Sequence, residues 1–413
     1  MTGPGNALID LASVRALARQ PLPVGVKGVP PRWWGRTPAE LTADAPNLFD
    51  AGVFGPVCVL RADAIRHNLD AMAAWCRERG VELAPHGKTH MSPQLAARQL
   101  AAGACAITVA TIGQAATFRA FGARSLILAN QLVDEAGLRW LGHELDADPT
   151  LEVLCWVDSV RGVQIMTSAL AGTRRAVDVC VEVGLPGGRT GCRTDAQVDE
   201  VARAATTSPR LRLVGVAGYE AALGHRRDTE AMAGVRSHLG QLRAAVIRLS
   251  ALFDADRVLV SAGGSTYFDA VAETLTDWPG HHAVRTVLRS GCYLTHDHGL
   301  YGRTSPLAGA LHPALEVHAQ VVSRPQPGSA IATMGRRDVA FDQDLPVPLD
   351  LPDGAVVALN DQHAYLRLGA AEPQVGDWLR FGISHPCTVF DKWQVIPEVD
   401  AEDRVVDLIR TYF

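Results

Sequence analysis

The sequence lacks an excess of charge of either sign. Its 413 residues include 39 Lys and Arg against 44 Asp and Glu, which gives a net charge of −5 and a pI near 6.3. Proteins that bind nucleic acid concentrate Lys and Arg in a basic patch, and no polybasic stretch suited to a phosphate backbone or a membrane surface occurs here. The composition therefore excludes nucleic-acid and membrane partners and favours work on small molecules.

Long hydrophobic runs are also missing. No apolar segment approaches the ~20 residues that a membrane-spanning helix needs. The N-terminus, MTGPGNALIDLASVRALARQ, lacks the charged region and apolar core of a secretory leader. With 47% hydrophobic and 20% charged residues, the sequence is typical of a soluble globular protein long enough for two domains. We expect it to be cytoplasmic.

Paired cysteine motifs are absent as well. The eight cysteines are scattered, several of them within apolar runs, which indicates reduced core thiols rather than a disulfide framework. A structural zinc site is closed by four ligands that usually come in paired clusters, and the sequence contains no CxxC pair.

Two good metal ligands nevertheless lie close together near the end of the chain. The segment ISHPCTVFDKW, residues 383–393, contains His385 and Cys387. In an extended segment, residues two apart point to the same face, so both side chains could bind one ion. A metal held by two protein ligands would remain open to substrate. The alternative is a His and a Cys packed in a strand core without any metal.

From Glu82 onward, short apolar runs alternate with helical patterns. Nearly continuous apolar residues are typical of strands buried on both faces of a parallel sheet. The expected strands cover residues 82–88, 105–111, 125–130, 151–158, 176–183, 211–220, 257–264 and 283–291. Eight β-α units predict a (β/α)8 TIM barrel. A doubly wound open sheet is the alternative, disfavoured because no GxGxxG follows the first strand.

The regions on either side of these units differ in character. Residues 305–413 combine Pro-rich connections with short strand patterns and little helix, which predicts a second, mostly antiparallel β domain. Residues 1–54 look irregular and are expected to pack on that domain or on a partner subunit. The sequence thus predicts an N-terminal extension, a barrel over residues 55–304, and a C-terminal β domain that carries His385 and Cys387.

Chemistry in a TIM barrel gathers where the strands end. Lys88 ends the first expected strand within the mostly apolar APHGKTH, where a desolvated lysine could form a Schiff base or act as a base. A lone lysine there could equally extend to the surface. The seventh and eighth strands end in SAGGST (residues 261–266) and RSGCY (residues 289–293), whose glycine-containing turns could bind phosphate. With Arg189 after the fifth strand and Tyr219 ending the sixth, the set suits a flat phosphorylated cofactor such as pyridoxal phosphate.

The order of PHGKTH, GGRTG, GGS and SG along the barrel resembles the fold-type III, alanine-racemase-like pyridoxal-phosphate enzymes. Within that fold, SHPCTVFDKW resembles the metal-dependent D-serine dehydratase and D-threonine aldolase branch, and the resemblance covers about residues 55–395. It implies a homodimer in which Lys88 holds the cofactor and acts as base at the substrate α-carbon. It further implies cofactor contacts from Arg189, Tyr219, Gly264, Ser265, Gly291 and Cys292, and a metal, with zinc expected, on His385 and Cys387.

The implied substrate is a β-hydroxy D-amino acid. Zinc would act as a Lewis acid while the β-hydroxyl leaves, so we expect a lyase that releases a 2-oxo acid and ammonia. An aldolase that breaks the Cα–Cβ bond is the closest alternative, and the soft thiolate of Cys387 favours zinc and the dehydratase. A racemase or a non-catalytic pyridoxal-phosphate protein are further alternatives. Substrate identity stays open because THDHG and DQHAY depart from the family pattern, which leaves roles open for His296, His298, Asp361 and His363.

Overall fold

The computed structural model describes residues 8–279 and 283–413, which divide into two compact units. The barrel unit comprises residues 8–10, Ala73–Lys88 and Gln99–Gly291. The β unit comprises Leu11–Met72, Thr89–Arg98 and Cys292–Phe413. Among the described residues, no helix is long and apolar enough to cross a bilayer.

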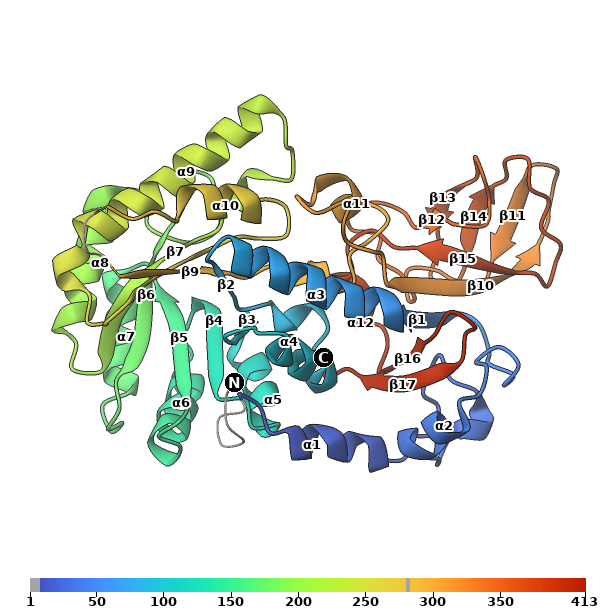
Figure 1. Cartoon of the computed structure of the whole chain (residues 1–413), viewed down its shortest axis with the longest axis horizontal. Coiled ribbons are helices and arrows are strands. Elements are labelled where there is room, and N and C mark those ends of the chain that lie inside the picture. Colours follow the sequence, from blue (N-terminus) through green and yellow to red (C-terminus); the bar gives the residue numbers. More distant parts are fainter. Residues whose placement is uncertain (1–7, 280–282) are drawn as a thin grey trace. The chain divides into compact units, whose positions relative to one another are not determined.

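The barrel unit is built on a sheet of eight parallel strands (Figure 1). Their order is β2-β9-β8-β7-β6-β5-β4-β3. The strands are β2 (Glu82–Leu83), β3 (Ile107–Val109), β4 (Ser125–Gln131), β5 (Glu152–Val157), β6 (Val177–Val183), β7 (Leu211–Gly218), β8 (Val258–Ala262) and β9 (Val284–Leu288). Each of the eight expected ranges coincides with one of them, with β4 extending one residue beyond its range, so the predicted barrel is confirmed.

The two edges of this sheet meet just beyond β2. The N–H of Cys105 donates to the carbonyl of Leu83 at 2.8 Å, and the N–H of Thr108 donates to the carbonyl of Pro85 at 2.9 Å. A parallel bridge between His86 and Thr108 completes the closure. The closing contacts therefore lie immediately before Lys88 in the chain.

Helices follow the strands and cover the outside of the barrel (Figure 1). They are α5 (Ile112–Ala120), α6 (Glu135–Ala147), α7 (Val160–Ala169), α8 (Asp195–Thr207), α9 (Thr229–Arg248) and α10 (Phe268–Thr274). Five of them begin at a side chain that accepts an N–H of the first turn, which stabilises a helix end by about 1 kcal/mol. These caps are Thr111, Asp134, Ser159, Thr194 and Asp228. The two remaining long helical segments are α3 (Ala62–Glu78) and α4 (Pro93–Ala101).

The β unit contains a nine-stranded, mostly antiparallel sheet, as predicted. The strand order is β13-β14-β11-β10-β1-β16-β17, and β15 pairs with both β10 and β12. Only the β1–β16 pair is parallel among these described strands. The strands are β1 (Val57–Arg61), β10 (Leu315–Ser323), β11 (Ser329–Ala332), β12 (Val347–Pro348), β13 (Ala355–Leu359), β14 (Ala364–Arg367), β15 (Trp378–Gly382), β16 (Val395–Val399) and β17 (Val405–Arg410).

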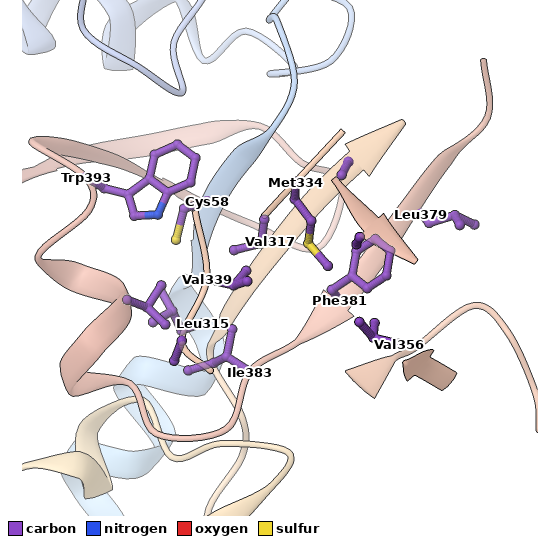
Figure 2. Packing of buried hydrophobic residues seen from close by; sticks show 14 of the residues in the cluster. Cys58, Leu315, Val317, Met334, Val339, Val356, Leu379, Phe381, Ile383 and Trp393 are labelled. Atoms are coloured by element: carbon purple, nitrogen blue, oxygen red, sulfur yellow. The ribbon is translucent and has the colours of Figure 1, made fainter. Parts of the chain in front are cut away.

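One hydrophobic core of the β unit anchors the segment that contains His385 and Cys387. Figure 2 shows Ile383 and Trp393, which flank this segment, packed among buried strand residues such as Val317 and Phe381. The Trp393 side chain is 1% exposed, and its Nε1 donates to the carbonyl of Asp338 at 3.0 Å. Because both ends of the segment are buried, the polar residues between them are held on a fixed support.

Residues 22–53 pack on the sheet of the β unit through a second core. This core joins N-terminal side chains such as Leu22, Trp33 and Leu41 to strand residues of β1, β16 and β17. The expectation that the segment is irregular is wrong for α1 (Leu11–Ala16) and α2 (Pro38–Asp44). A capping box between Thr37 and Glu40, followed by Pro at the first helical position, explains why α2 forms.

The predicted domain ranges, 1–54, 55–304 and 305–413, do not coincide with the two units. Strand β1 lies within the range expected for the barrel, yet it pairs with β10 and β16 in the sheet of the β unit. The division into three domains with those boundaries stays a prediction.

Candidate active site

Lys88 lies in a short 3-10 turn, Gly87–Thr89, that follows β2. Glycine is required at position 87 because an added Cβ would come within 2.7 Å of the Phe118 ring. The Lys88 side chain is half-buried, and its amine has no hydrogen-bond or ion-pair partner in the described part of the chain. An unpaired amine near the carboxyl end of a barrel strand is available to react with a carbonyl group.

Three cations surround His86 at this end of the barrel. The pKa of His86 is lowered well below its usual value, first by burial and then by the positive charges of Lys88, Arg289 and Arg189. Its Nδ1 is buried and has no hydrogen-bond partner among residues 8–279 and 283–413. The ring therefore stays neutral, and the positive charges that act on it suit an anionic group.

Arg289, directly after β9, is buried within the barrel unit. Its side chain donates to the hydroxyl of Ser261 and to the carbonyl of Gly218, and its guanidinium lies 5.4 Å from the centre of the Trp156 ring. Burial lowers the pKa of Arg289, while the negative charge of Glu220 opposes this shift. Arg289 thus links the ends of the three strands β7, β8 and β9. Its guanidinium also places a fixed positive charge there.

Arg189 and Tyr219, both expected to contact the cofactor, meet each other. The guanidinium of Arg189 lies 4.4 Å from the centre of the Tyr219 ring, a distance typical of a cation–π pair. The loop that carries Arg189 is shaped by Arg193, which donates to the carbonyls of Thr190 at 2.6 Å and Gly188 at 2.7 Å. Arg189 and Tyr219 lie close together because they follow the neighbouring parallel strands β6 and β7, which end at the same face of the barrel.

The turn after β8 is held by a carboxylate. Glu220 is 0% exposed and accepts hydrogen bonds from the N–H groups of Gly263 at 3.0 Å and Gly264 at 2.7 Å. Gly263 has φ +94°, a conformation that favours glycine. Because the Gly264 N–H is committed to Glu220, a phosphate would need other donors here. The half-buried Ser265 hydroxyl makes no hydrogen bond within the described residues and is such a donor.

The turn after β9 lies against the turn after β8. The hydroxyl of Ser290 and the N–H of Arg289 both donate to the carbonyl of Gly263 at 3.1 Å. The structure therefore places Gly291, the next residue, beside the turn that carries Gly264 and Ser265. A paired glycine turn with a free hydroxyl and nearby arginines fits a phosphate group.

Cys292 belongs to the β unit, and its side chain contacts the proposed metal pair. Its Sγ lies 3.5 Å from the Sγ of Cys387. The hydroxyl of Thr89 lies 3.4 Å from the same Cys387 sulfur. No pattern in the sequence predicts the Cys292 thiol at this position.

His385 and Cys387 do not lie in a strand, so the extended conformation expected for them is wrong. Strand β15 ends at Gly382, His385 has φ +77°, and Cys387 begins the short helix α12 (Cys387–Phe390). The intervening Pro386 has helical angles and cannot donate to a strand ladder, which explains the break. The unusual backbone of His385 is held by its N–H, which donates to Asp297 Oδ2 at 3.0 Å.

The two side chains are nevertheless adjacent. Burial alone would lower the pKa of His385, but the hydrogen bond and charge of Cys387, together with Asp342, raise it to about 9. The pKa of Cys387 is lowered well below its usual value, first by a hydrogen bond from Cys292 and then by His385 against the effect of burial. A thiol beside an imidazole provides the two ligand types that a divalent metal binds once both groups have lost their protons.

This pair fits a metal with open positions. Among residues 8–279 and 283–413, no group of three or more His, Cys, Asp or Glu side chains is arranged to hold an ion. His385 Nδ1 pairs with Asp342 Oδ2 at 2.6 Å, and Asp342 Oδ1 accepts from the Thr388 hydroxyl at 2.6 Å. A carboxylate that orients a ligating histidine is a common feature of metal sites.

The other residues left open by the sequence lie in two different settings. His296 and His298 are buried or nearly so, and neither Nδ1 has a partner in the described chain. Burial is the main reason that the pKa of His296 falls to about 4 and that the pKa of His298 is lowered. Asp361 and His363 are exposed, and Asp361 pairs with Arg337. Their exposure at the β13–β14 turn gives no support for a catalytic role.

Comparison with known proteins agrees with this architecture. Residues 60–294 match the family "Alanine racemase, N-terminal domain", and residues 314–399 match the "Putative serine dehydratase domain". D-threonine aldolase of Arthrobacter sp. is 30% identical over 347 residues, which cover 83% of this chain and 88% of that protein. The chain belongs to the alanine-racemase-like, fold-type III pyridoxal-phosphate enzymes. Membership covers both units, since the two family matches lie on either side of residue 300.

Solved structures of other fold-type III enzymes share this fold. D-threonine aldolase from Filomicrobium marinum has a TM-score of 0.76 at 24% identity, with 87% of this chain and 95% of that chain covered. D-threo-3-hydroxyaspartate dehydratase from Delftia sp. HT23 has a TM-score of 0.73 at 24% identity, with 87% and 98% covered. In sequence, that dehydratase is 32% identical over 145 residues, 34% of this chain and 36% of its own length. A cysteine-to-alanine variant of D-threo-3-hydroxyaspartate dehydratase has been solved in a metal-free form.

Sequence reasoning missed four residues, three beside the expected cofactor residues of the barrel unit and one beside the proposed metal pair of the β unit. His86 and Arg289 stand in motifs quoted for their neighbours, and Glu220 follows Tyr219 directly, so proximity to a motif was the available signal. Asp342 lies 43 residues before His385 and carries no local signal.

Proposed function

We propose that this protein is a pyridoxal-phosphate- and zinc-dependent lyase that dehydrates and deaminates a β-hydroxy D-amino acid to a 2-oxo acid and ammonia. The observation that carries the proposal is the adjacency of the Cys387 and His385 side chains in a chain that also offers the unpaired amine of Lys88. The lyase class is supported by relatives named as aldolases and a dehydratase of β-hydroxy D-amino acids.

In the barrel unit, Lys88 would hold the cofactor through its amine and then move a proton at the substrate α-carbon. Bound pyridoxal phosphate would supply an electron sink for that carbon. Tyr219 and Arg189 would contact the ring, and Ser265 with the Gly291 turn would bind the phosphate. The positive charges of Arg289 and Arg189 favour the anionic cofactor, and burial together with the nearby cations lowers the pKa of His86.

In the β unit, His385 and Cys387 would hold the metal. A divalent ion there would supply a Lewis acid for the β-hydroxyl of the substrate. Cys387 provides a soft ligand that favours zinc over magnesium or manganese. Asp342 would accept a hydrogen bond from the Nδ1–H of His385, which leaves Nε2 as the nitrogen that can bind the ion. The metal-free cysteine variant of the related dehydratase supports a metal in this branch.

A D-threonine-type aldolase is the second candidate. The observation in its favour is that D-threonine aldolase of Arthrobacter sp. aligns with 83% of this chain, whereas the dehydratase aligns in sequence with 34%. The two reactions differ in which bond to the β-carbon breaks. The aldolase releases an aldehyde and glycine, and the dehydratase releases a 2-oxo acid and ammonia.

A substrate panel separates these candidates. The full-length protein, supplied with pyridoxal phosphate and zinc, is incubated with D-serine, D-threonine and D-threo-3-hydroxyaspartate and with their L enantiomers. We expect ammonia and 2-oxo acid in equal amounts from a D substrate. Release of an aldehyde and glycine would instead identify an aldolase. Interconversion of enantiomers alone would indicate a racemase. Absence of all these products would reject both lyase functions.

A variant at the metal pair links this activity to the β unit. Cys387→Ala should keep the visible absorbance of the bound cofactor and lose turnover, because the metal that Cys387 would bind acts on the leaving group and not on cofactor binding. Cys76→Ala, at a buried thiol of α3, is the matched control and should keep both. Unchanged turnover in Cys387→Ala would remove the metal role from the proposal.

We also propose, from the family resemblance, that the enzyme is a cytoplasmic homodimer. Light scattering of the purified protein should then give twice the chain mass of 44.1 kDa.

A further inference from the structure

Cys292 and Cys387 form a close pair of thiols in the β unit. Their sulfurs lie 3.5 Å apart although the residues are 95 positions apart in the sequence. Cys292 begins the 3-10 turn η6 (Cys292–Leu294), and Cys387 begins α12. All eight cysteines of the chain are free thiols in this structure.

The surroundings of the pair favour a sulfur–sulfur contact. Cys292 is 5% exposed and packs with Leu300, Tyr301 and Cys387 in one small apolar cluster. Cys387 is partly buried and packs against this cluster. A disulfide bond is about 2.05 Å long, so the sulfurs need to approach by about 1.5 Å. Both residues begin single helical turns and lie outside the strands of the sheet.

We propose that Cys292 and Cys387 form a reversible disulfide when no metal is bound, which makes this thiol pair a site of oxidation by low-molecular-weight disulfides. In the first step the thiolate of Cys387 attacks one sulfur of the reagent and releases one reagent thiol. The thiol of Cys292 then attacks the mixed disulfide at Cys387, loses its proton and releases the second reagent thiol. Two electrons and two protons pass from the protein to the reagent, so the exchange is balanced.

The consequence for the metal rests on the proposed function. A sulfur in a disulfide has no thiolate to donate, so the oxidised protein would retain only His385 of the proposed ligand pair. Conversely, an ion bound to Cys387 occupies the electron pair that would attack the reagent. Metal binding and disulfide formation therefore exclude each other, and loss of metal exposes the protein to oxidation at this one place.

The test counts thiols in the full chain. The protein is stripped with a chelator, incubated with oxidised glutathione, unfolded, alkylated and weighed by mass spectrometry. We expect eight alkylated thiols before oxidation and six afterwards, with a linked pair of peptides that contain residues 292 and 387. Eight thiols after oxidation, or a link between other residues, would overturn the disulfide.

Two variants and one metal arm complete the experiment. Cys292→Ser should form no internal link, whereas the control Cys76→Ser should still lose two thiols and give the same linked peptides. Cys292→Ala provides a second variant if the serine does not fold. Zinc added before the oxidant should keep all eight thiols. Oxidation that proceeds equally with zinc would leave the disulfide in place and reject Cys387 as a metal ligand, so the two failures are distinguishable.

Discussion

The carboxylate of Asp342 accepts a hydrogen bond from Nδ1 of His385 at 2.6 Å. The other oxygen of the same carboxylate accepts the hydroxyl of Thr388, also at 2.6 Å. Asp342 thus fixes the ring orientation of His385 and is itself fixed by the helix that Cys387 begins. The relationship makes Asp342 a positioning residue for the proposed metal ligand.

Asp342→Asn should weaken zinc binding by roughly 10- to 100-fold, because the amide cannot accept the Nδ1 proton as strongly as a carboxylate. Competition for zinc with a chromophoric chelator measures this without any assay of turnover. Thr388→Val should give a smaller loss, since it frees only one side of the carboxylate. Asp361→Asn, at an exposed turn, is the control. Equal zinc affinity in Asp342→Asn and the control would contradict the role.

Lys88→Ala should abolish the visible absorbance of the bound cofactor and all turnover, because the chain contains only two other lysines, Lys27 and Lys392. Lys27 pairs with Asp338, and Lys392 pairs with the adjacent Asp391. Lys392→Ala should therefore keep the absorbance. Borohydride reduction of the native protein followed by peptide mapping should place the label on residue 88. A visible band in Lys88→Ala would show that another lysine holds the cofactor.

Glu220→Gln should raise the dissociation constant of pyridoxal phosphate by on the order of tenfold, or about 1.4 kcal/mol, the size of one buried hydrogen bond. The glutamine keeps one acceptor oxygen, so only one of the Gly263 and Gly264 N–H groups remains bound. Equilibrium dialysis of the cofactor measures the change. Glu230→Gln, on the exposed face of α9, should leave the constant unchanged. The same dissociation constant in both variants would mean that the Gly263–Gly264 turn binds the cofactor without help from the carboxylate.

The buried ion pair between Glu316 and Arg61 should make stability depend on acid pH. Burial tends to raise the pKa of Glu316, but the hydrogen bond from His318 and the charge of Arg61 lower it from 4.5 to about 2. Because the folded value lies below the unfolded one, the unfolded chain binds the proton first as the pH falls. The contribution, about 3 kcal/mol, is therefore complete above pH 4.5 and is lost between pH 4.5 and 2.

Urea unfolding at several pH values checks this dependence. Glu316→Gln should be less stable at neutral pH and should lose less stability than the native chain between pH 4.5 and 2. Glu402→Gln, at an exposed turn, should follow the native curve. Parallel curves for Glu316→Gln and the native protein would assign the acid sensitivity to other groups.

The barrel was predictable from sequence because its strands are apolar on both faces. Runs such as Leu126–Leu128 and Val179–Val181 are buried throughout, and this pattern needs no knowledge of distant residues. The positions of Lys88, Arg189 and Tyr219 followed, because parallel strands end at the same face. Their assigned roles stay predictions.

The local geometry of the proposed metal pair was not predictable in the same way. The spacing of His385 and Cys387 suggested an extended segment, but Pro386 and the hydrogen bond to Asp297 produce a left-handed residue and a helix start. Contacts such as Asp342 to His385 and Cys292 to Cys387 join residues far apart in the chain. Periodicity carries no information about such pairs, so only the folded structure reveals them.

The closure of the barrel also has a dynamic consequence. Its last backbone bonds run from Cys105 and Thr108 to Leu83 and Pro85, and Lys88 follows three residues later. A ligand at concentration [L] that binds only when this seam is closed lowers the equilibrium population of the open seam by the factor 1 + [L]/Kd. The amide of Thr108 should therefore exchange with solvent deuterium more slowly in the cofactor-loaded protein than in the empty one, and would act as a built-in reporter of occupancy.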